Sequence, residues 1–288
     1  MLRELGIGPL WRLRSSADEV QPEPVAPAAR AAAVPHGGKD VLDEIPRTPV
    51  ARASSNAPAH ASAKRPAPGA SGIARPQPVQ TGPAVDPTQV ATLGWEALEQ
   101  TIAECRACAL HVQRHLTVPG SGDRQARLML VGEGPGAEED KRGQPFVGAA
   151  GELLDAMLAA IGLNREQGVY IANAVKCRPP FNRTPHEDEI TACSPYLARQ
   201  IQLVKPDLII ALGRQAAQRL LGQEVRINAA RGRMWRFGDA IPLIVTYHPA
   251  YLLRNPADKA KAWADLCLVR RHLDEKQKKT ADIGFETK

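Results

Sequence analysis

A glycine-rich segment holds the residues in this sequence that are best suited to chemistry. It reads GEGPGAEEDKRGQPFVG over residues 132–148 and follows the apolar run RLMLV. Glycine turns that leave a strand commonly bind phosphate through backbone N–H groups. This one carries Glu133, Glu138, Glu139 and Asp140, which would repel a phosphate. Its glycine spacing matches the dinucleotide fingerprint, but the acids and the interrupting GQPFVG exclude that use, and the Lys of a P-loop is absent.

A flat, neutral heterocycle suits the loop better than a phosphate. Pro135 and the glycines predict a tight turn that leaves backbone donors accessible. Phe146, in the sequence PFVG, is expected to be an exposed ring beside them. Stacking of a base on such a ring contributes about 1–3 kcal/mol. From the loop alone, an ordinary core position for Phe146 remains the alternative.

Four cysteines have the spacing of a metal site. Cys105 and Cys108 form a C-x2-C pair, and Cys177 and Cys193 follow with 15 residues between them. Four thiolates suit zinc or an iron–sulfur cluster, and the spacing does not separate the two. Unrelated buried thiols are the alternative. Because Cys177 lies four residues beyond Asn173, a metal here would fix the backbone that aims Asn173.

Four apolar runs predict the strands that position these residues: 127–132, 169–175, 207–213 and 242–248. Each run precedes a helical pattern, which predicts a parallel sheet covered by helices on both faces. Ligands bind at the carboxyl ends of such strands, where residues 132–136, 173–178, 213–214 and 248–254 lie. Thr184 and Pro185 predict the start of one helix, with Glu187 completing a capping box.

The amino-acid composition divides the chain into an Ala/Pro-rich N-terminal region, a folded domain and a short tail. Residues 1–88 contain 14 of the 25 prolines and one aromatic residue, which predicts a disordered Ala/Pro-rich region. A folded domain is expected over 89–275 and a flexible tail over 276–288. Apolar residues near the start, among them Trp11, could form a segment that binds a partner protein, although an unselected tail explains them more simply. The net charge of +6 is compatible with a polyanionic partner. Because no apolar run approaches a membrane span, we expect a cytoplasmic protein. We also expect it to be a monomer.

Several long motifs together resemble the family 4 uracil-DNA glycosylases of bacteria and archaea. They are GEGPGAEEDKRGQPFVGAAGELLD, ANAVKCRPPFNRTP, HPAYLLR and the four cysteines, and the resemblance covers about residues 94–273. It implies a three-layer α/β/α fold around a short, mainly parallel four-stranded sheet. It also implies a [4Fe-4S] cluster on the cysteines and the hydrolysis of uracil from DNA, which leaves an abasic site for base excision repair. The base must first be extruded from the stack.

The resemblance assigns roles to individual residues. Phe146 would stack on the extruded uracil, while the Asn173 amide would pair with its N3–H and O4. Glu139 would crowd the C5 position and exclude the methyl group of thymine. His248 would donate a hydrogen bond to O2 and stabilise the charge that develops on the departing base.

The water-activating group is left open by the resemblance. Better-known uracil glycosylases carry an Asp in the first motif, where this sequence has Gly134, as is usual for family 4. Gly134 is therefore assigned to substrate binding, and Glu133, Asn173 or a backbone carbonyl to the water. A related group that crosslinks to DNA uses a histidine that this chain lacks between Arg214 and His248.

The segment HPAYLLR supplies candidate DNA contacts. Tyr251, Leu252 and Leu253 would wedge into the vacated stack, and Arg254 would contact phosphate. Two other functions fit the same sequence. One is a non-catalytic iron–sulfur DNA-binding module recruited to a polymerase, and the other is a glycosylase for another deaminated base such as hypoxanthine.

Overall fold

Short apolar strands form the centre of the fold. In this computed structural model, which describes residues 81–238 and 240–285, the sheet has six strands in the order β1-β3-β2-β4-β6-β5. The strands are β1 (Ser121–Gly122), β2 (Leu128–Gly132), β3 (Val169–Asn173), β4 (Leu208–Leu212), β5 (Met234–Phe237) and β6 (Ile241–Thr246).

The four predicted strands pair in parallel, which confirms that part of the expected fold. The sheet has two more strands than expected, because an antiparallel strand pairs with each edge: β1 with β3, and β5 with β6. Neither edge strand has a strong sequence signal. β1 has only two residues, and β5 alternates half-buried with exposed side chains.

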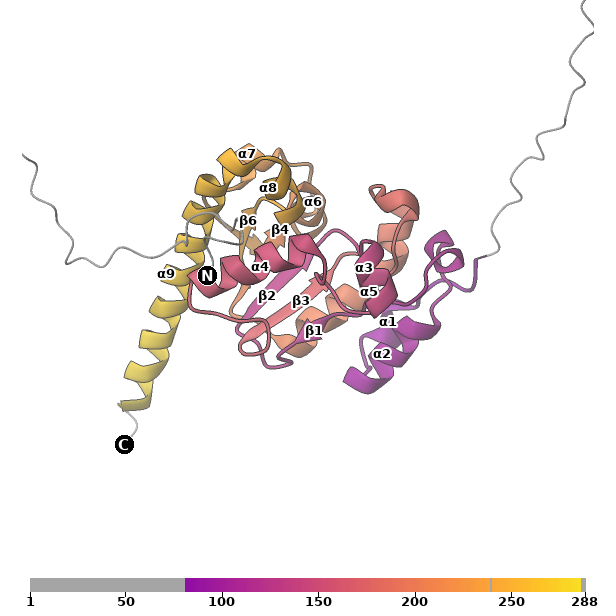
Figure 1. The fold of residues 1–288 in the computed structure, drawn as a ribbon. Coiled ribbons are helices and arrows are strands. Elements are labelled where there is room, and N and C mark those ends of the chain that lie inside the picture. Colours follow the sequence, from indigo (N-terminus) through magenta and orange to yellow (C-terminus); the bar gives the residue numbers. More distant parts are fainter. Residues whose placement is uncertain (1–80, 239, 286–288) are drawn as a thin grey trace, which may run out of the picture. The chain divides into compact units, whose positions relative to one another are not determined.

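Helices cover both faces of the sheet (Figure 1). The α-helices are α1 (Pro87–Val90), α2 (Trp95–Glu104), α3 (Ala137–Arg142), α4 (Ala149–Ala160), α5 (Glu187–Val204), α6 (Arg214–Leu221), α7 (Ile227–Ala230), α8 (Pro249–Arg254) and α9 (Lys259–Phe285). Three 3-10 turns join them: η1 (Ala109–Val112), η2 (Pro180–Asn182) and η3 (Pro256–Asp258).

Alternate residues of each strand enter separate cores, as the two-residue period of a strand requires. Leu128 and Leu130 of β2 pack with α4, α8 and α9 on one face. Met129 and Val131 pack with α5 and α6 on the other. A third cluster joins α1 and α2 to the start of α5 and contains the cysteines. The three-layer α/β/α arrangement is therefore confirmed.

Two predicted boundaries fall inside helices. The predicted domain start at residue 89 lies within α1, and the fold already includes Gly82, whose N–H donates to the Arg106 carbonyl at 2.7 Å. The predicted tail from residue 276 begins within α9, which continues to Phe285. Residues 1–80, expected to be disordered, lie outside the described residues. No helix in the described part of the chain is long and apolar enough to cross a membrane.

The start of α5 also differs from the prediction. Its N-cap is His186, two residues beyond Thr184, and the capping-box acid is Glu189. The Glu189 carboxylate accepts from the backbone N–H of His186 at 2.8 Å and from the guanidinium of Arg183 at 2.6 Å. The buried acid therefore decides where the helix begins, and Thr184 is left in the preceding loop.

Candidate active site

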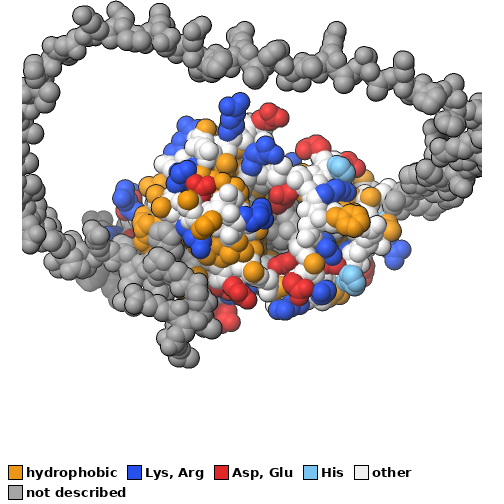
Figure 2. Space-filling model, turned by 45° about the horizontal axis from the view of Figure 1, so that its top comes forward, with side chains coloured by type: hydrophobic (Ala, Val, Ile, Leu, Met, Phe, Trp, Pro, Cys, Tyr) orange, Lys and Arg blue, Asp and Glu red, His pale blue; other side chains and the backbone are white. Residues whose placement is uncertain are grey.

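One cavity opens at the carboxyl ends of the parallel strands. The chain passes from β2 to β3 on one side and then crosses to β4 on the other, so β2 lies at the point where the direction of winding reverses. Ligands bind at such points. The cavity has a volume of about 400 Å³. Figure 2 shows the corresponding face, where Lys and Arg side chains are interspersed with Asp and Glu around a central hollow.

Asn173, the last residue of β3, presents its amide to this cavity. The side chain is only 1% exposed, and its Oδ1 has no hydrogen-bond partner among the described residues. Buried polar atoms are nearly always paired, so the oxygen is available to a donor on a ligand. Gly132 of β2 pairs with Asn173 of β3, and this position requires a glycine. A Cβ at Gly132 would lie 2.4 Å from Oδ1 and 2.8 Å from the Phe146 ring.

Phe146 lines the same cavity but is not the exposed ring that its loop suggested. It is only 5% exposed and belongs to the core cluster beside α4. Its backbone has a φ of 54°, which bulky residues rarely adopt. Arg165 donates to its carbonyl at 2.9 Å and so helps to fix this conformation. The ring is therefore held rigidly, with one part in the core and another facing the cavity.

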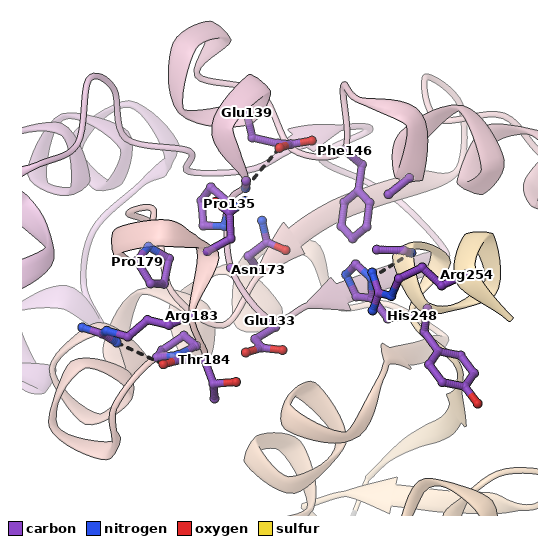
Figure 3. Close-up of a pocket in the computed structure, with 17 residues that line it drawn as sticks. Glu133, Pro135, Glu139, Phe146, Asn173, Pro179, Arg183, Thr184, His248 and Arg254 are labelled. Carbon is purple, nitrogen blue, oxygen red and sulfur yellow. Dashed lines mark hydrogen bonds between the residues drawn. The ribbon is translucent and has the colours of Figure 1, made fainter. Parts of the chain in front are cut away.

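His248 stands beside Phe146, with the two ring centroids 5.5 Å apart (Figure 3). It is the N-cap of α8, and its Nδ1 accepts from the N–H of Ala250 at 3.1 Å. Burial, together with the nearby charge of Arg254, lowers the pKa of His248 to about 4. The ring is therefore neutral at pH 7, and because Nδ1 acts as the acceptor, Nε2 carries the hydrogen. His248 is a neutral donor facing the cavity.

Glu139 braces the two loops that carry these groups. Its carboxylate accepts from Gly136 N at 3.1 Å and from Val147 N at 3.0 Å. A third bond of 3.3 Å comes from the N–H of Gly148. The side chain lines the cavity, so it presents a fixed carboxylate there. Glu138 and Asp140 have other roles, since Glu138 pairs with Lys141 and Asp140 is buried against His115.

Glu133 and Gly134 also line the cavity. Burial raises the pKa of the Glu133 carboxyl, while the Thr184 hydroxyl and the Arg214 guanidinium act in the opposite direction. A carboxyl group with a raised pKa is a stronger base once it is ionised. Gly134 has no room for a side chain, because a Cβ would lie 2.8 Å from Val175 Cγ2.

The opposite wall of the cavity was not assigned from the sequence. Residues of the segment 179–185 line it, and Figure 3 shows Pro179, Arg183 and Thr184 across the cavity from His248 and Arg254. This segment lies within the motif ANAVKCRPPFNRTP, which was the available signal. Its residues have no obvious catalytic chemistry, so their position depends on the fold.

Known proteins are similar in sequence to this chain over all six strands of the sheet. The family model described as "Uracil DNA glycosylase superfamily" matches residues 119–267. A type-4 uracil-DNA glycosylase of Pyrobaculum aerophilum is 43% identical over 180 residues, which are 60% of this chain and 91% of that protein. The type-4 enzyme of Thermotoga maritima is 45% identical over 167 residues, 58% of this chain and 86% of that protein.

The chain belongs to the type-4 uracil-DNA glycosylase family. A type-5 uracil-DNA glycosylase of Pyrobaculum aerophilum is a more distant relative, 34% identical over 157 residues, 48% of this chain and 67% of that protein. Of the residues that the family resemblance assigned to substrate binding or catalysis, the structure brings six to one cavity: Glu133, Gly134, Glu139, Phe146, Asn173 and His248.

The segment α8 of this type-4 family member presents only part of the expected wedge. Leu252 is 1% exposed and packs in the core with α4 and α9. The prediction that Leu252 contacts DNA is therefore wrong. Leu253 is 45% exposed. Tyr251 stacks on Tyr247 and donates its hydroxyl to Asp258 at 2.7 Å. Arg254 lines the cavity and has no ion pair within the described ranges.

The four predicted metal ligands line a second, smaller cavity: Cys105, Cys108, Cys177 and Cys193. Arg114 donates to the sulfur of Cys177 at 3.1 Å, and the backbone N–H of Lys176 donates to that of Cys193 at 3.2 Å. Burial raises the pKa of Cys108 to about 11 and that of Cys193 to about 12, so thiolates here need a compensating cation. Among the described residues, no group of three or more His, Cys, Asp or Glu side chains is arranged around a point where one metal ion would bind.

Proposed function

We propose that this protein hydrolyses the N-glycosidic bond of deoxyuridine in DNA, leaving free uracil and an abasic site for base excision repair. The observation that carries the proposal is the buried, unpartnered Oδ1 of Asn173 in the same cavity as the neutral His248. A cavity of this kind is far smaller than a duplex. The substrate base therefore has to leave the stack before it can bind.

Asn173 would recognise the base by its edge. Uracil presents an N3–H donor beside the O4 acceptor, and the amide of Asn173 offers the complementary acceptor and donor. Cytosine inverts this pattern, and it would leave the buried Oδ1 unpaired. An unpaired buried group costs about 1–3 kcal/mol, which favours uracil strongly. Phe146 would hold the plane of the base by stacking.

His248 would act when the bond breaks. As the bond between C1′ of the sugar and N1 of uracil breaks, its electron pair leaves with the base and charge develops on O2. The Nε2–H of His248 would donate to that oxygen. A fixed donor of this kind contributes most in a site that excludes water. Because the pKa of His248 is about 4, the ring stabilises the anion as a neutral donor and transfers no proton at pH 7.

Water completes the reaction at C1′, which is electron-deficient once the base departs. The oxygen of water bonds to C1′, and its proton passes to a base in the site. Glu133 is the group we favour, because it lines the cavity and burial raises its pKa. Its negative charge would also stabilise the cationic sugar. Gly134 would leave room for the sugar beside it.

Glu139 would exclude thymine. Three backbone N–H groups fix its carboxylate, so the side chain cannot move aside for an added methyl group at C5. A polar, immobile wall beside C5 disfavours a methyl group both sterically and by desolvation.

The cysteines would hold a [4Fe-4S] cluster. Four thiols that surround a cavity, rather than converge on one point, suit a polynuclear cluster better than a single zinc ion. When bound, the cluster supplies a structural crosslink between the segments that follow α2 and β3 and the second turn of α5. Hydrogen bonds from Arg114 and Lys176 would stabilise the sulfur charge.

Three further expectations are part of the proposal. The enzyme would act as a monomer in the cytoplasm, and the region 1–88 would bind a partner protein. The type-4 relatives are covered almost completely by about 60% of this chain, so much of its remainder lies outside the region shared with them.

The proposal is tested by incubating excess full-length protein with oligonucleotides that contain uracil, thymine, hypoxanthine or xanthine. We expect release of uracil from single- and double-stranded DNA, with thymine spared. Binding of uracil-DNA without release of the base would favour a non-catalytic DNA-binding module. Faster release of hypoxanthine or xanthine would assign another deaminated base. For the cluster, broad absorbance near ~400 nm with iron present is expected, and a colourless protein with stoichiometric zinc would overturn it.

A further inference from the structure

Phe181 is the most exposed large hydrophobic residue in the part of the chain that the structure describes. Its side chain is 97% exposed, compared with 45% for Leu253. Its backbone φ is 56°, in the left-handed region that bulky residues rarely occupy. Conformations of this kind persist where the surrounding structure enforces them, and they are concentrated at ligand-binding sites.

The surrounding loop holds Phe181 in place at both ends. Before it, the chain leaves the cysteine cavity at Cys177 and enters two successive prolines. After it, the Asn182 N–H donates to the Pro179 carbonyl at 3.0 Å, and its Oδ1 accepts from Arg178 at 2.7 Å. Arg183 then forms two bonds with the buried carboxylate of Glu189. The exposed ring is therefore carried by a fixed loop.

This loop forms a wall of the uracil cavity. Pro179 and Asn182 line the cavity on either side of Phe181 in the chain. Phe181 itself does not line it, so its ring projects into solvent from the loop that forms this wall. Across the cavity, α8 presents Arg254 at the wall and the exposed Leu253 next to it. Figure 3 shows the two walls facing each other, with Pro179 on one and Arg254 on the other. Each of the two walls thus carries an exposed apolar side chain next in sequence to residues that line the cavity.

We propose that Phe181 is a DNA-binding residue whose ring stacks on the base next to the extruded uridine, in the same strand. This inference rests on the proposed function. When a uridine enters the cavity, its strand continues past the rim, and the neighbouring base loses a stacking partner. The exposed Phe181 ring, on the fixed loop that forms this wall, would replace that partner. The side chain of Arg178, held against the loop by Asn182, adds positive charge beside the strand.

The experiment uses a single-stranded oligonucleotide with one uridine, so that no base from an opposite strand is present. Two further oligonucleotides lack the base on the 5′ or the 3′ side of the uridine. Uracil release is measured for wild type, Phe181→Ala, Phe181→Trp and Met234→Ala. Met234 is the matched control, because it is 45% exposed and does not line the cavity.

On the intact strand we expect Phe181→Ala to raise KM by about tenfold, the scale of one lost base–aromatic stack. Phe181→Trp and Met234→Ala should keep the wild-type KM. On one of the two oligonucleotides that lack a neighbouring base, wild type and Phe181→Ala should have the same KM, because the base that the ring contacts is absent.

The inference is overturned if Phe181→Ala keeps the wild-type KM on the intact strand. It is also overturned if the KM of Phe181→Ala stays raised above that of wild type on both oligonucleotides that lack a neighbouring base. A wild-type protein that releases no uracil at all would refute the proposed function instead. The two failures are therefore distinguishable.

Discussion

The buried ammonium of Lys176 donates a 2.8 Å hydrogen bond to the backbone carbonyl of Asn173. A second bond, of 2.6 Å, runs from the same group to Gln200 Oε1. Lys176 is followed directly by Cys177, so one buried cation lies between the residue proposed to read uracil and the cysteine cavity. The position of Asn173 thus depends on β3 and on this ammonium together.

Replacing Lys176 should therefore affect both stability and base recognition. In Lys176→Met, the Asn173 carbonyl and Gln200 Oε1 lose their donor in a buried site, which costs about 1–3 kcal/mol in the free energy of unfolding. We expect uracil release to fall as well, because the end of β3 is less fixed. Urea unfolding and single-turnover release measure the two effects. Unchanged values for both would contradict the structural role of this contact.

Gly132 should tolerate no side chain. In Gly132→Ala, the new Cβ would collide with Asn173 Oδ1 and with the Phe146 ring. We expect a destabilisation of about 1–3 kcal/mol and a loss of uracil release larger than tenfold. Gly94→Ala is the control, because a Cβ there would meet nothing within 4 Å. Equal activity of the two variants would show that Gly132 does not shape the cavity.

Adjacent leucines of α8 should give opposite results. Leu252→Ala removes a buried side chain and should lower the free energy of unfolding by about 2–5 kcal/mol. Leu253→Ala should leave stability within about 0.5 kcal/mol of wild type and raise KM for uracil-DNA. Chemical denaturation and steady-state kinetics on one duplex separate the two. The assignment is wrong if Leu253→Ala is the less stable variant, or if it keeps the wild-type KM.

His248 makes stability depend on pH. Its pKa is lowered from 6.5 to about 4, so between these values the unfolded chain binds more protons than the folded protein. Stability that is fully present above pH 6.5 is therefore lost as the pH falls toward 4. Protonation also removes the acceptor for the Ala250 N–H.

We therefore compare the free energy of unfolding at pH 7 and at about pH 4.5 for wild type and His248→Gln. The loss on acidification should be smaller in the variant by about 2 kcal/mol, a figure reduced from the full shift because the ring meets solvent in the cavity. Identical losses would mean that His248 is not buried in its neutral form.

The sequence predicted the parts of the fold that rest on regular patterns. The apolar runs at 127–132 and 207–213 identified central strands, because strands buried on both faces must be apolar throughout. The edge strand β5 was missed, since a half-exposed strand carries no such run. Which of Leu252 and Leu253 enters the core depends on how a six-residue helix packs, and no periodicity over so short a length reveals it.

The candidate site was predictable in its chemistry but not in its full outline. Asn173 is the last residue of β3 and His248 lies two residues beyond β6, so the parallel arrangement brings them together. Phe146 was assigned to the right cavity, yet its burial depends on α4, which follows it in the chain. The wall formed by Pro179 and Arg183 comes from a loop without catalytic residue types, so only the folded chain reveals it.

The central claim is that one cavity binds the extruded uracil through Asn173 and stabilises it through His248 as the bond breaks. The single-turnover rate of uracil release tests this claim most directly, using one oligonucleotide with wild type, Asn173→Ala, His248→Ala and the double variant. Each single change should lower the rate by at least ~100-fold, the effect of removing one transition-state donor. The double variant should be at least as slow as the slower single one. A double variant that releases uracil at the wild-type rate would contradict the account.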